Sequence, residues 1–159
     1  MNETALPDLD DAEAVRRFID RIDGPERLRA LLDAPGMDDD ARIEEVVAAA
    51  GAPEILDRVF QIMGERFVPE RAGDAAGAVQ WGVRTPTGVY TYHVVISGGR
   101  ARGERGALSG AALSLKIAAP DLLRVCAGRL NAVTAFTSGK IKLEGDMMFG
   151  AKMSAWFDY

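Results

Sequence analysis

The sequence contains little of the chemistry that enzymes use. Its 159 residues include one cysteine, Cys126, and one histidine, His93. A single cysteine excludes an internal disulfide and offers no metal framework, and its apolar neighbours indicate a packed, unreactive thiol. No serine, cysteine or carboxylate is spaced from His93 in a way that would indicate an acid–base or nucleophilic site. We therefore predict no catalytic residue, no metal site and no cofactor.

Long hydrophobic runs are also missing. The longest, such as residues 94–96, are too short to cross a bilayer. The start, Met1-Asn2-Glu3, lacks a basic, apolar leader, so we expect no secretory signal and a cytoplasmic location.

The net charge of −5 is unevenly placed. Up to Glu45 there are 14 acidic and 6 basic side chains, and after it 10 acidic and 13 basic. The overall acidity argues against a nucleic-acid partner. The mildly basic part of the chain after Glu45 has two interpretations. Its charge keeps the protein soluble, or it allows contact with an anionic membrane surface.

What the sequence does contain first is a series of helical patterns. Apolar residues recur at helical spacing in residues 14–22, 28–32 and 43–47, with proline and glycine between them. We predict a helical N-terminal extension over residues 1–37 and a separate domain over residues 38–159. Two short amphipathic helices are marginal alone. We expect them to dock on the domain or on a second subunit through their apolar residues, which are Phe18, Ile19, Ile22, Leu28 and Leu31.

The strongest helical pattern spans residues 53–68. Its apolar residues Leu56, Phe60, Met63 and Phe67 fall at i, i+4, i+7 and i+11, and Pro69 is expected to end the helix. The pattern predicts a core-facing helix. The same face could form one wall of a ligand cavity.

From Ala78 onward the apolar period changes to two. Alternation predicts strands over residues 78–84, 89–97, 100–105, 110–117 and 141–144, with helices over residues 120–128, 132–136 and the apolar C-terminus. Consecutive hairpins favour an essentially antiparallel sheet with helices on one face. The predicted fold class is therefore α+β.

Several short motifs occur in a defined order and resemble one known family, the type-2 sterol carrier proteins. They lie between about Ala52 and Phe157 and comprise Phe67-Val68-Pro69-Glu70, Asp121-Leu122-Leu123, Gly128-Arg129-Leu130, Ala135-Phe136, Ser138-Gly139-Lys140-Ile141-Lys142-Leu143 and Gly145-Asp146. The resemblance implies a mainly antiparallel five-stranded sheet whose helices enclose a tunnel for sterols, acyl chains or phospholipids, without catalytic machinery. The ending Asp158-Tyr159 differs from the peroxisomal targeting tripeptide of animal members.

The resemblance therefore implies a protein that carries a hydrophobic ligand. The residues expected to line its tunnel are Phe60, Met63, Phe67, Trp81, Tyr92, Leu113, Leu115, Phe136, Ile141, Met147, Phe149, Met153 and Trp156. In a carrier, Phe60→Ala should weaken binding and leave the fold largely intact. In a solid core it should cost ~3–5 kcal/mol of stability.

Two other functions stay open. One is an enzyme or accessory subunit that acts on or presents a hydrophobic intermediate, as a similar domain does in ubiquinone biosynthesis. The other is a protein-interaction module whose core is filled. Further partners to consider are a membrane surface, in transient contact, and a second copy of the chain as a homodimer.

Overall fold

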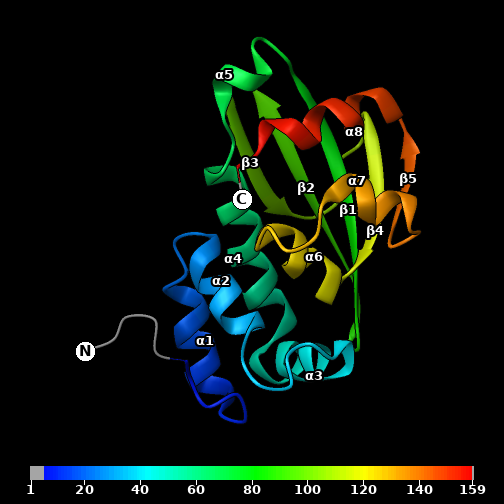
Figure 1. The fold of residues 1–159 in the computed structure, drawn as a ribbon. Coiled ribbons are helices and arrows are strands. Elements are labelled where there is room, and N and C mark those ends of the chain that lie inside the picture. The colour runs from blue at the N-terminus through cyan, green and yellow to red at the C-terminus, as the bar shows by residue number, and fades with distance from the viewer. Residues whose placement is uncertain (1–5, 159) are drawn as a thin grey trace.

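A five-stranded sheet forms one layer of the fold (Figure 1), as seen in a computed structural model that describes residues 6–158. In space the strands follow the order β3-β2-β1-β4-β5. Their bounds are β1 Gly77–Thr85, β2 Gly88–Ser97, β3 Arg100–Arg105, β4 Leu113–Ala118 and β5 Ile141–Gly145. The α+β class with five strands is confirmed.

One pair of neighbouring strands departs from the predicted antiparallel arrangement. β1 and β4 run parallel, and the other three pairs are antiparallel. β2 occupies one edge of β1, and the chain after β3 crosses to the other edge of β1 instead of pairing with β3. Crossing brings β4 in along the same direction as β1, with Trp81 opposite Leu115.

Helices cover one face of this sheet and form a second layer (Figure 1). Side-chain caps begin several of them; the carboxylate of Asp11, for example, accepts from the backbone of Glu13 and Ala14. The helices are α1 Ala12–Asp20, α2 Pro25–Leu32, α3 Asp40–Ala50, α4 Ala52–Glu65, α5 Pro69–Ala72, α6 Ala119–Cys126, α7 Ala132–Thr137, α8 Met147–Met153 and the 3-10 helix η1 Ser154–Trp156.

Two predicted boundaries were wrong. The helix expected over residues 53–68 ends at Glu65, and Pro69 begins α5 instead of ending α4, because proline suits the first turn of a helix. The fourth strand begins at Leu113 rather than Gly110, whose φ of 80° is incompatible with a strand.

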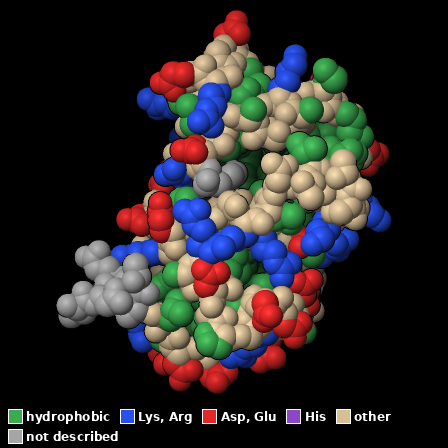
Figure 2. All heavy atoms as spheres, viewed as in Figure 1, with side chains coloured by type: hydrophobic (Ala, Val, Ile, Leu, Met, Phe, Trp, Pro, Cys, Tyr) green, Lys and Arg blue, Asp and Glu red, His purple; other side chains and the backbone are tan. Residues whose placement is uncertain are grey.

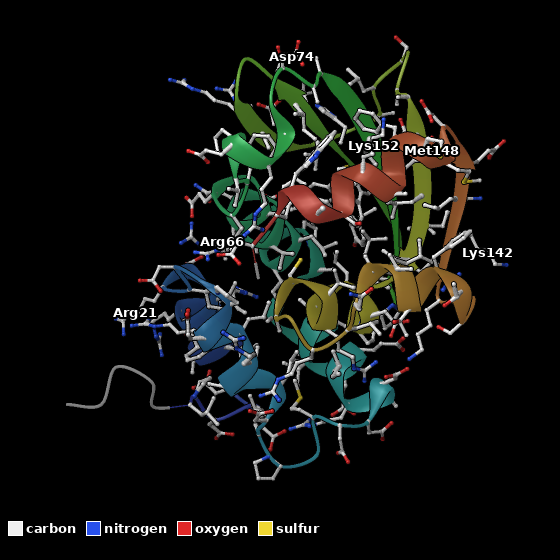
Figure 3. The ribbon with its side chains drawn as sticks, turned by 45° about the horizontal axis from the view of Figure 1, so that its top comes forward. Arg21, Arg66, Asp74, Lys142, Met148 and Lys152 are labelled. Carbon is white, nitrogen blue, oxygen red and sulfur yellow. The ribbon has the colours of Figure 1, made fainter. Side chains whose placement is uncertain are left out.

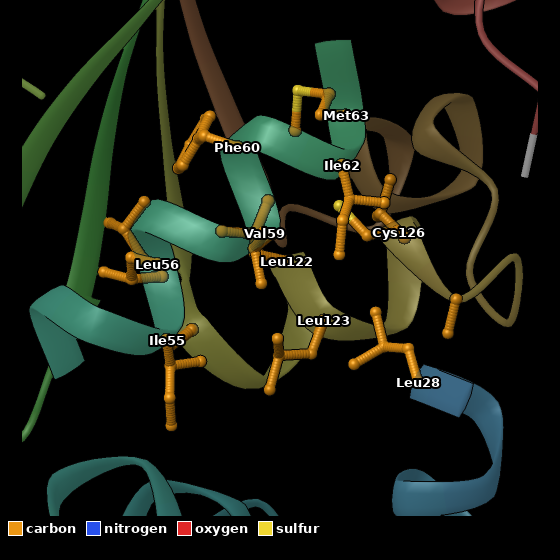
Figure 4. Packing of buried hydrophobic residues seen from close by; sticks show 14 of the residues in the cluster. Leu28, Ile55, Leu56, Val59, Phe60, Ile62, Met63, Leu122, Leu123 and Cys126 are labelled. Atoms are coloured by element: carbon orange, nitrogen blue, oxygen red, sulfur yellow. The ribbon is translucent and has the colours of Figure 1, made fainter. Parts of the chain in front are cut away.

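Helix α4 lies unusually close to the sheet. A Cβ atom on Gly103 of β3 would stand 2.6 Å from the carbonyl oxygen of Phe60 on α4, so only glycine permits this approach. On its other side α4 packs against α6, and Figure 4 shows Leu122, Cys126 and the nearby Leu28 of α2 in this cluster. The core is therefore continuous from the sheet to the N-terminal helices.

The N-terminal helices dock on the domain's own surface. The five residues predicted for this docking, Phe18, Ile19, Ile22, Leu28 and Leu31, are buried and belong to the common core. An ion pair of 2.6 Å joins Asp33, after α2, to Arg129, after α6. The division into residues 1–37 and 38–159 stays a prediction, and residues 1–5 of it lie outside the described part of the chain.

Candidate functional site

A cavity of about 740 Å³ lies between the sheet and the C-terminal helices. Its inner wall comes from the inward faces of the strands, chiefly Trp81 on β1, Leu113 and Leu115 on β4, and Ile141 and Leu143 on β5. Period-two alternation places these side chains on one face, because successive side chains of a strand point to opposite sides. The space-filling view of the molecule shows a hollow near the middle of the visible surface, with hydrophobic atoms inside it (Figure 2).

Helices α7 and α8 and the chain after α8 form the outer wall. Phe136 and Val133 come from α7, and Met147, Met148 and Met153 from α8. Asp146 caps the start of helix α8, because its carboxylate accepts a hydrogen bond of 3.0 Å from the backbone N–H of Phe149. These soft methionine side chains can adapt to ligands of irregular shape.

Residues 156–158 are held in place over the cavity by the residues that follow α4. Arg66 Nε donates to the carbonyl of Asp158 at 2.6 Å, and the backbone N–H of Val68 donates to the carbonyl of Trp156 at 2.7 Å. The rings of Phe67 and Phe157 meet edge to face at 5.5 Å. The segment from α8 to Asp158 is thus a strap fixed at its far end.

Most polar side chains in the wall form hydrogen bonds with nearby backbone groups. Asn131 caps α7, Thr137 Oγ1 donates to the carbonyl of Thr134 at 3.1 Å, and Ser154 Oγ donates to the carbonyl of Ala151 at 2.8 Å. Trp81 Nε1 is buried and has no hydrogen-bond partner among residues 6–158. The cavity therefore offers mainly apolar contact, which suits a hydrocarbon better than a sugar or a nucleotide.

Eight of the thirteen residues proposed from the sequence lie in the cavity wall. They are Met63, Trp81, Leu113, Leu115, Phe136, Ile141, Met147 and Met153. Their binding role remains a proposal.

The other five predicted wall residues lie outside the wall of this cavity. Contact between them and a ligand stays a prediction. Phe60 and Tyr92 stack on each other at 4.4 Å in the layer between α4 and the sheet. Phe67 packs on the end of the strap, and Phe149 and Trp156 pack on each other at 5.7 Å. Each ring is held by an aromatic partner instead of facing the void.

Sequence reasoning missed several apolar wall residues, among them Val94, Val125, Leu130, Val133, Leu143, Met148 and Phe157. Leu143 and Val94 carried a usable signal, since each alternates in phase with an inward neighbour. Leu130 lies at the end of a loop and Val133 in the short helix α7. Neither segment is long enough for a hydrophobic period to show which side chains point inward.

A polar cluster joins α4 to the sheet away from the cavity wall. Asp57 accepts hydrogen bonds of 2.6 Å from the Tyr92 hydroxyl and from two nitrogens of Arg105. Burial alone would raise the pKa of Asp57, but the hydrogen bonds from Arg105 and Tyr92 outweigh it and hold this pKa below its ordinary value. Burial, followed by the hydrogen bond to Asp57, raises the pKa of the Tyr92 hydroxyl. The geometry is that of a structural clamp.

His93 lies on the sheet face opposite Tyr92. Its Nδ1 donates to the carbonyl of Gly106 at 2.9 Å, and its Nε2 lies 3.9 Å from a carboxylate oxygen of Glu104. Among residues 6–158, no group of three or more histidine, cysteine, aspartate or glutamate side chains is arranged to hold a metal ion. Each helix within residues 6–158 is too short or too polar to span a bilayer.

Comparison with known families agrees with this architecture. The profile of the SCP-2 sterol transfer family matches residues 63–158, which is more than half of the sequence. The chain therefore belongs to the SCP-2 sterol transfer family. Its general function is lipid or sterol binding or transfer. The search of curated proteins finds no significant match.

Two solved structures share the fold. The crystal structure of Sterol Carrier Protein 2 Like 2 from Aedes aegypti is 21% identical, with a TM-score of 0.53, and the match covers 65% of this chain and 94% of that one. The stereoselective inverting sec-alkylsulfatase Pisa1 from Pseudomonas sp. is 16% identical, with a TM-score of 0.57. That match covers 93% of this chain but only 30% of the alkylsulfatase, so most of the N-terminal helical region also has a counterpart there.

Proposed function

We propose that this chain binds one apolar ligand reversibly in the cavity beneath α7 and α8 and carries it chemically unchanged. The observation that carries the proposal is a space of about 740 Å³ whose wall is almost wholly apolar. Cavities of roughly 300–1,000 Å³ are typical for small ligands. A void of this size supports a carrier over an interaction module with a filled core.

The binding energy would come from burying alkyl surface. Each methylene removed from water contributes about 0.8 kcal/mol, so an acyl chain of about ten buried methylenes gains about 8 kcal/mol before costs. Loss of translational and rotational freedom opposes this gain by at least about 4 kcal/mol. The balance predicts affinities weak enough for the ligand to leave again, as a carrier requires.

Native mass spectrometry of freshly purified protein tests the proposal, together with titration of cis-parinaric acid, a fluorescent fatty acid. We expect either a co-purified lipid or saturable binding of the probe at one site per chain. A chain that is empty and does not bind the probe would refute the carrier function.

A second candidate function is presentation of a hydrophobic substrate to an enzyme. It is favoured by one observation, the shared fold with a region that makes up 30% of an alkylsulfatase. Transfer of bound cis-parinaric acid to acceptor vesicles separates the two functions. Rapid spontaneous release supports carriage, and retention of the probe supports presentation.

A further inference from the structure

The largest exposed hydrophobic side chains gather at one place. Among residues 6–158, six large hydrophobic side chains are strongly exposed, and four of them also line the cavity. These four are Val133 and Phe136 on α7 and Met147 and Met148 on α8, with exposures of 44–68%. A side chain that faces both the cavity and the solvent marks the opening, so the opening of the cavity is ringed by apolar groups.

We refer to this ring, Val133, Phe136, Met147 and Met148, as the mouth patch. An aromatic side chain buries about 150–250 Å², and four residues of similar or slightly smaller size, about half exposed, offer about 400 Å². A stable protein–protein interface uses about 800 Å² per partner. The mouth patch is therefore too small for a stable dimer by itself, but insertion into a bilayer requires no matching surface.

One lysine, Lys152, lies beside the mouth patch, in a segment that is rich in lysine. The chain has only four lysines, and three of them, Lys140, Lys142 and Lys152, lie within the segment 140–152. Lys152 follows Met148 by one helical turn on α8, so the two share a face of the helix, and Figure 3 shows both on α8. Neither Lys142 nor Lys152 forms an ion pair with another described residue, and Lys140 Nζ lies 3.9 Å from Asp121.

Most of the nearby carboxylates have internal partners. Asp146 caps α8, and Asp158 lies 3.4 Å from Arg66 Nη2. Glu144 is exposed and has no such partner within residues 6–158, but it lies on β5 in phase with Lys142, on the face away from the cavity. The free charge beside the mouth patch is thus positive at Lys152.

The acidic part of the chain lies far from the mouth patch. Figure 1 shows α1 and α2 at the opposite end of the molecule from α8 and β5. Residues up to Glu45 carry 14 acidic and 6 basic side chains, and the rest of the chain 10 acidic and 13 basic. This charge asymmetry orients the end that carries Lys152 toward an anionic surface and the acidic helices away from it.

From these observations we propose that the mouth patch docks on a bilayer that contains anionic phospholipid. Met148 and its apolar neighbours enter the boundary between headgroups and acyl chains, and Lys152 contacts lipid phosphates while its alkyl stem stays on the apolar side. The opening of the cavity then faces lipid, so that an apolar ligand passes between bilayer and cavity without crossing water. This passage rests on the proposed carrier function.

Flotation of the full chain with vesicles tests the docking surface. Vesicles of phosphatidylcholine are compared with vesicles of phosphatidylcholine and phosphatidylserine. The wild type should bind the mixed vesicles more strongly. Lys152→Gln should weaken this binding about fivefold and lose its effect at high salt. Met148→Gln should weaken it about three- to fivefold at any salt concentration.

Val89→Gln is the matched control, because Val89 is 65% exposed and lies on β2, outside the cavity wall. It should bind vesicles like the wild type. Equal binding to the two kinds of vesicle would overturn the assignment to anionic lipid. Equal loss in Val89→Gln and Met148→Gln, or no loss in either Met148→Gln or Lys152→Gln, would overturn the docking surface.

Light scattering tests for the competing occupant of the mouth patch, a second copy of the chain. A dimer that Met148→Gln dissociates would assign the mouth patch to a second copy of the chain and overturn the membrane proposal. Binding of cis-parinaric acid without vesicles keeps the two proposals apart, because Lys152→Gln should leave it unchanged. A wild type that binds this probe but no vesicle loses the docking surface and keeps the carrier function. A wild type that binds vesicles but not the probe loses the carrier function and keeps the docking surface.

Discussion

Two phenylalanines in very different surroundings permit a direct test of how the protein separates stability from binding. Phe60 is 0% exposed, stacks on Tyr92 at 4.4 Å and meets Trp81 edge to face at 5.4 Å. Phe136 is 44% exposed and lines the cavity at its opening. The same substitution, to alanine, therefore removes a core side chain in one variant and a cavity side chain in the other.

The expected magnitudes differ accordingly. Phe60→Ala deletes a fully packed ring and should lower the free energy of unfolding by ~3–5 kcal/mol. Phe136→Ala should lower it by less than about 1 kcal/mol, because much of the ring already faces solvent or the void. Full burial of a phenylalanine is worth about 1.5–3 kcal/mol. Contact of about half the ring with ligand then contributes about 1 kcal/mol, so the probe should bind Phe136→Ala about fivefold more weakly.

Denaturant unfolding measures the first quantity, and titration with cis-parinaric acid measures the second. The chain has two tryptophans, of which Trp81 lines the cavity and Trp156 does not. A Trp156→Phe background therefore leaves Trp81 as the sole fluorescent reporter of the wall. Energy transfer from Trp81 to the bound probe would place the ligand beside β1.

Two results would refute this reasoning. Comparable losses of stability in Phe60→Ala and Phe136→Ala would show that the space under α7 is filled in solution. The second result is a folded Phe60→Ala variant that no longer binds the probe, together with a Phe136→Ala variant that still binds it. This result would place the ligand between α4 and the sheet. The second outcome would restore the sequence-based expectation that Phe60 forms part of the wall.

Three further predictions follow from particular contacts. Arg66→Ala should speed release of bound cis-parinaric acid in stopped-flow experiments, because Arg66 holds the end of the strap. Its stability should change by no more than ~1 kcal/mol, and an unchanged release rate would show that the strap is not a gate. Gly103→Ala should lower the free energy of unfolding by about 1–3 kcal/mol, since its Cβ would lie 2.6 Å from a backbone oxygen of α4. Gly82→Ala, whose nearest neighbour would be at 3.6 Å, is the control, and equal losses would contradict the close approach. The folded state lowers the pKa of Asp57, so its carboxylate stabilises the protein above the unfolded pKa of about 3.9 and loses this effect as pH falls through the folded pKa. The difference in Tm between wild type and Asp57→Asn should therefore shrink below about pH 4, whereas a constant difference would exclude this linkage.

Much of the architecture follows from short-range patterns in the sequence. Apolar period 3.6 predicts α4, and period two predicts β1, β2 and β5. Capping residues and glycine–proline pairs predict the ends of several helices. The ordered motifs between Phe67 and Asp146 indicate the family, which the profile over residues 63–158 confirms. These patterns depend on residues that are close in the sequence, so they can be recognised without knowing the tertiary contacts.

The tertiary structure decided which strands are neighbours and which inward side chains meet empty space. The parallel pairing of β1 and β4 depends on a crossing of the chain that no local pattern encodes. Phe60 and Phe136 are both apolar aromatics, and periodicity says only that a side chain points inward. Phe60 meets two rings because Gly103 allows α4 to approach the sheet closely. Phe136 lines a void because a cavity remains between the sheet and helices α7 and α8. Packing across the fold, not spacing along the chain, makes one a core residue and the other part of the cavity wall.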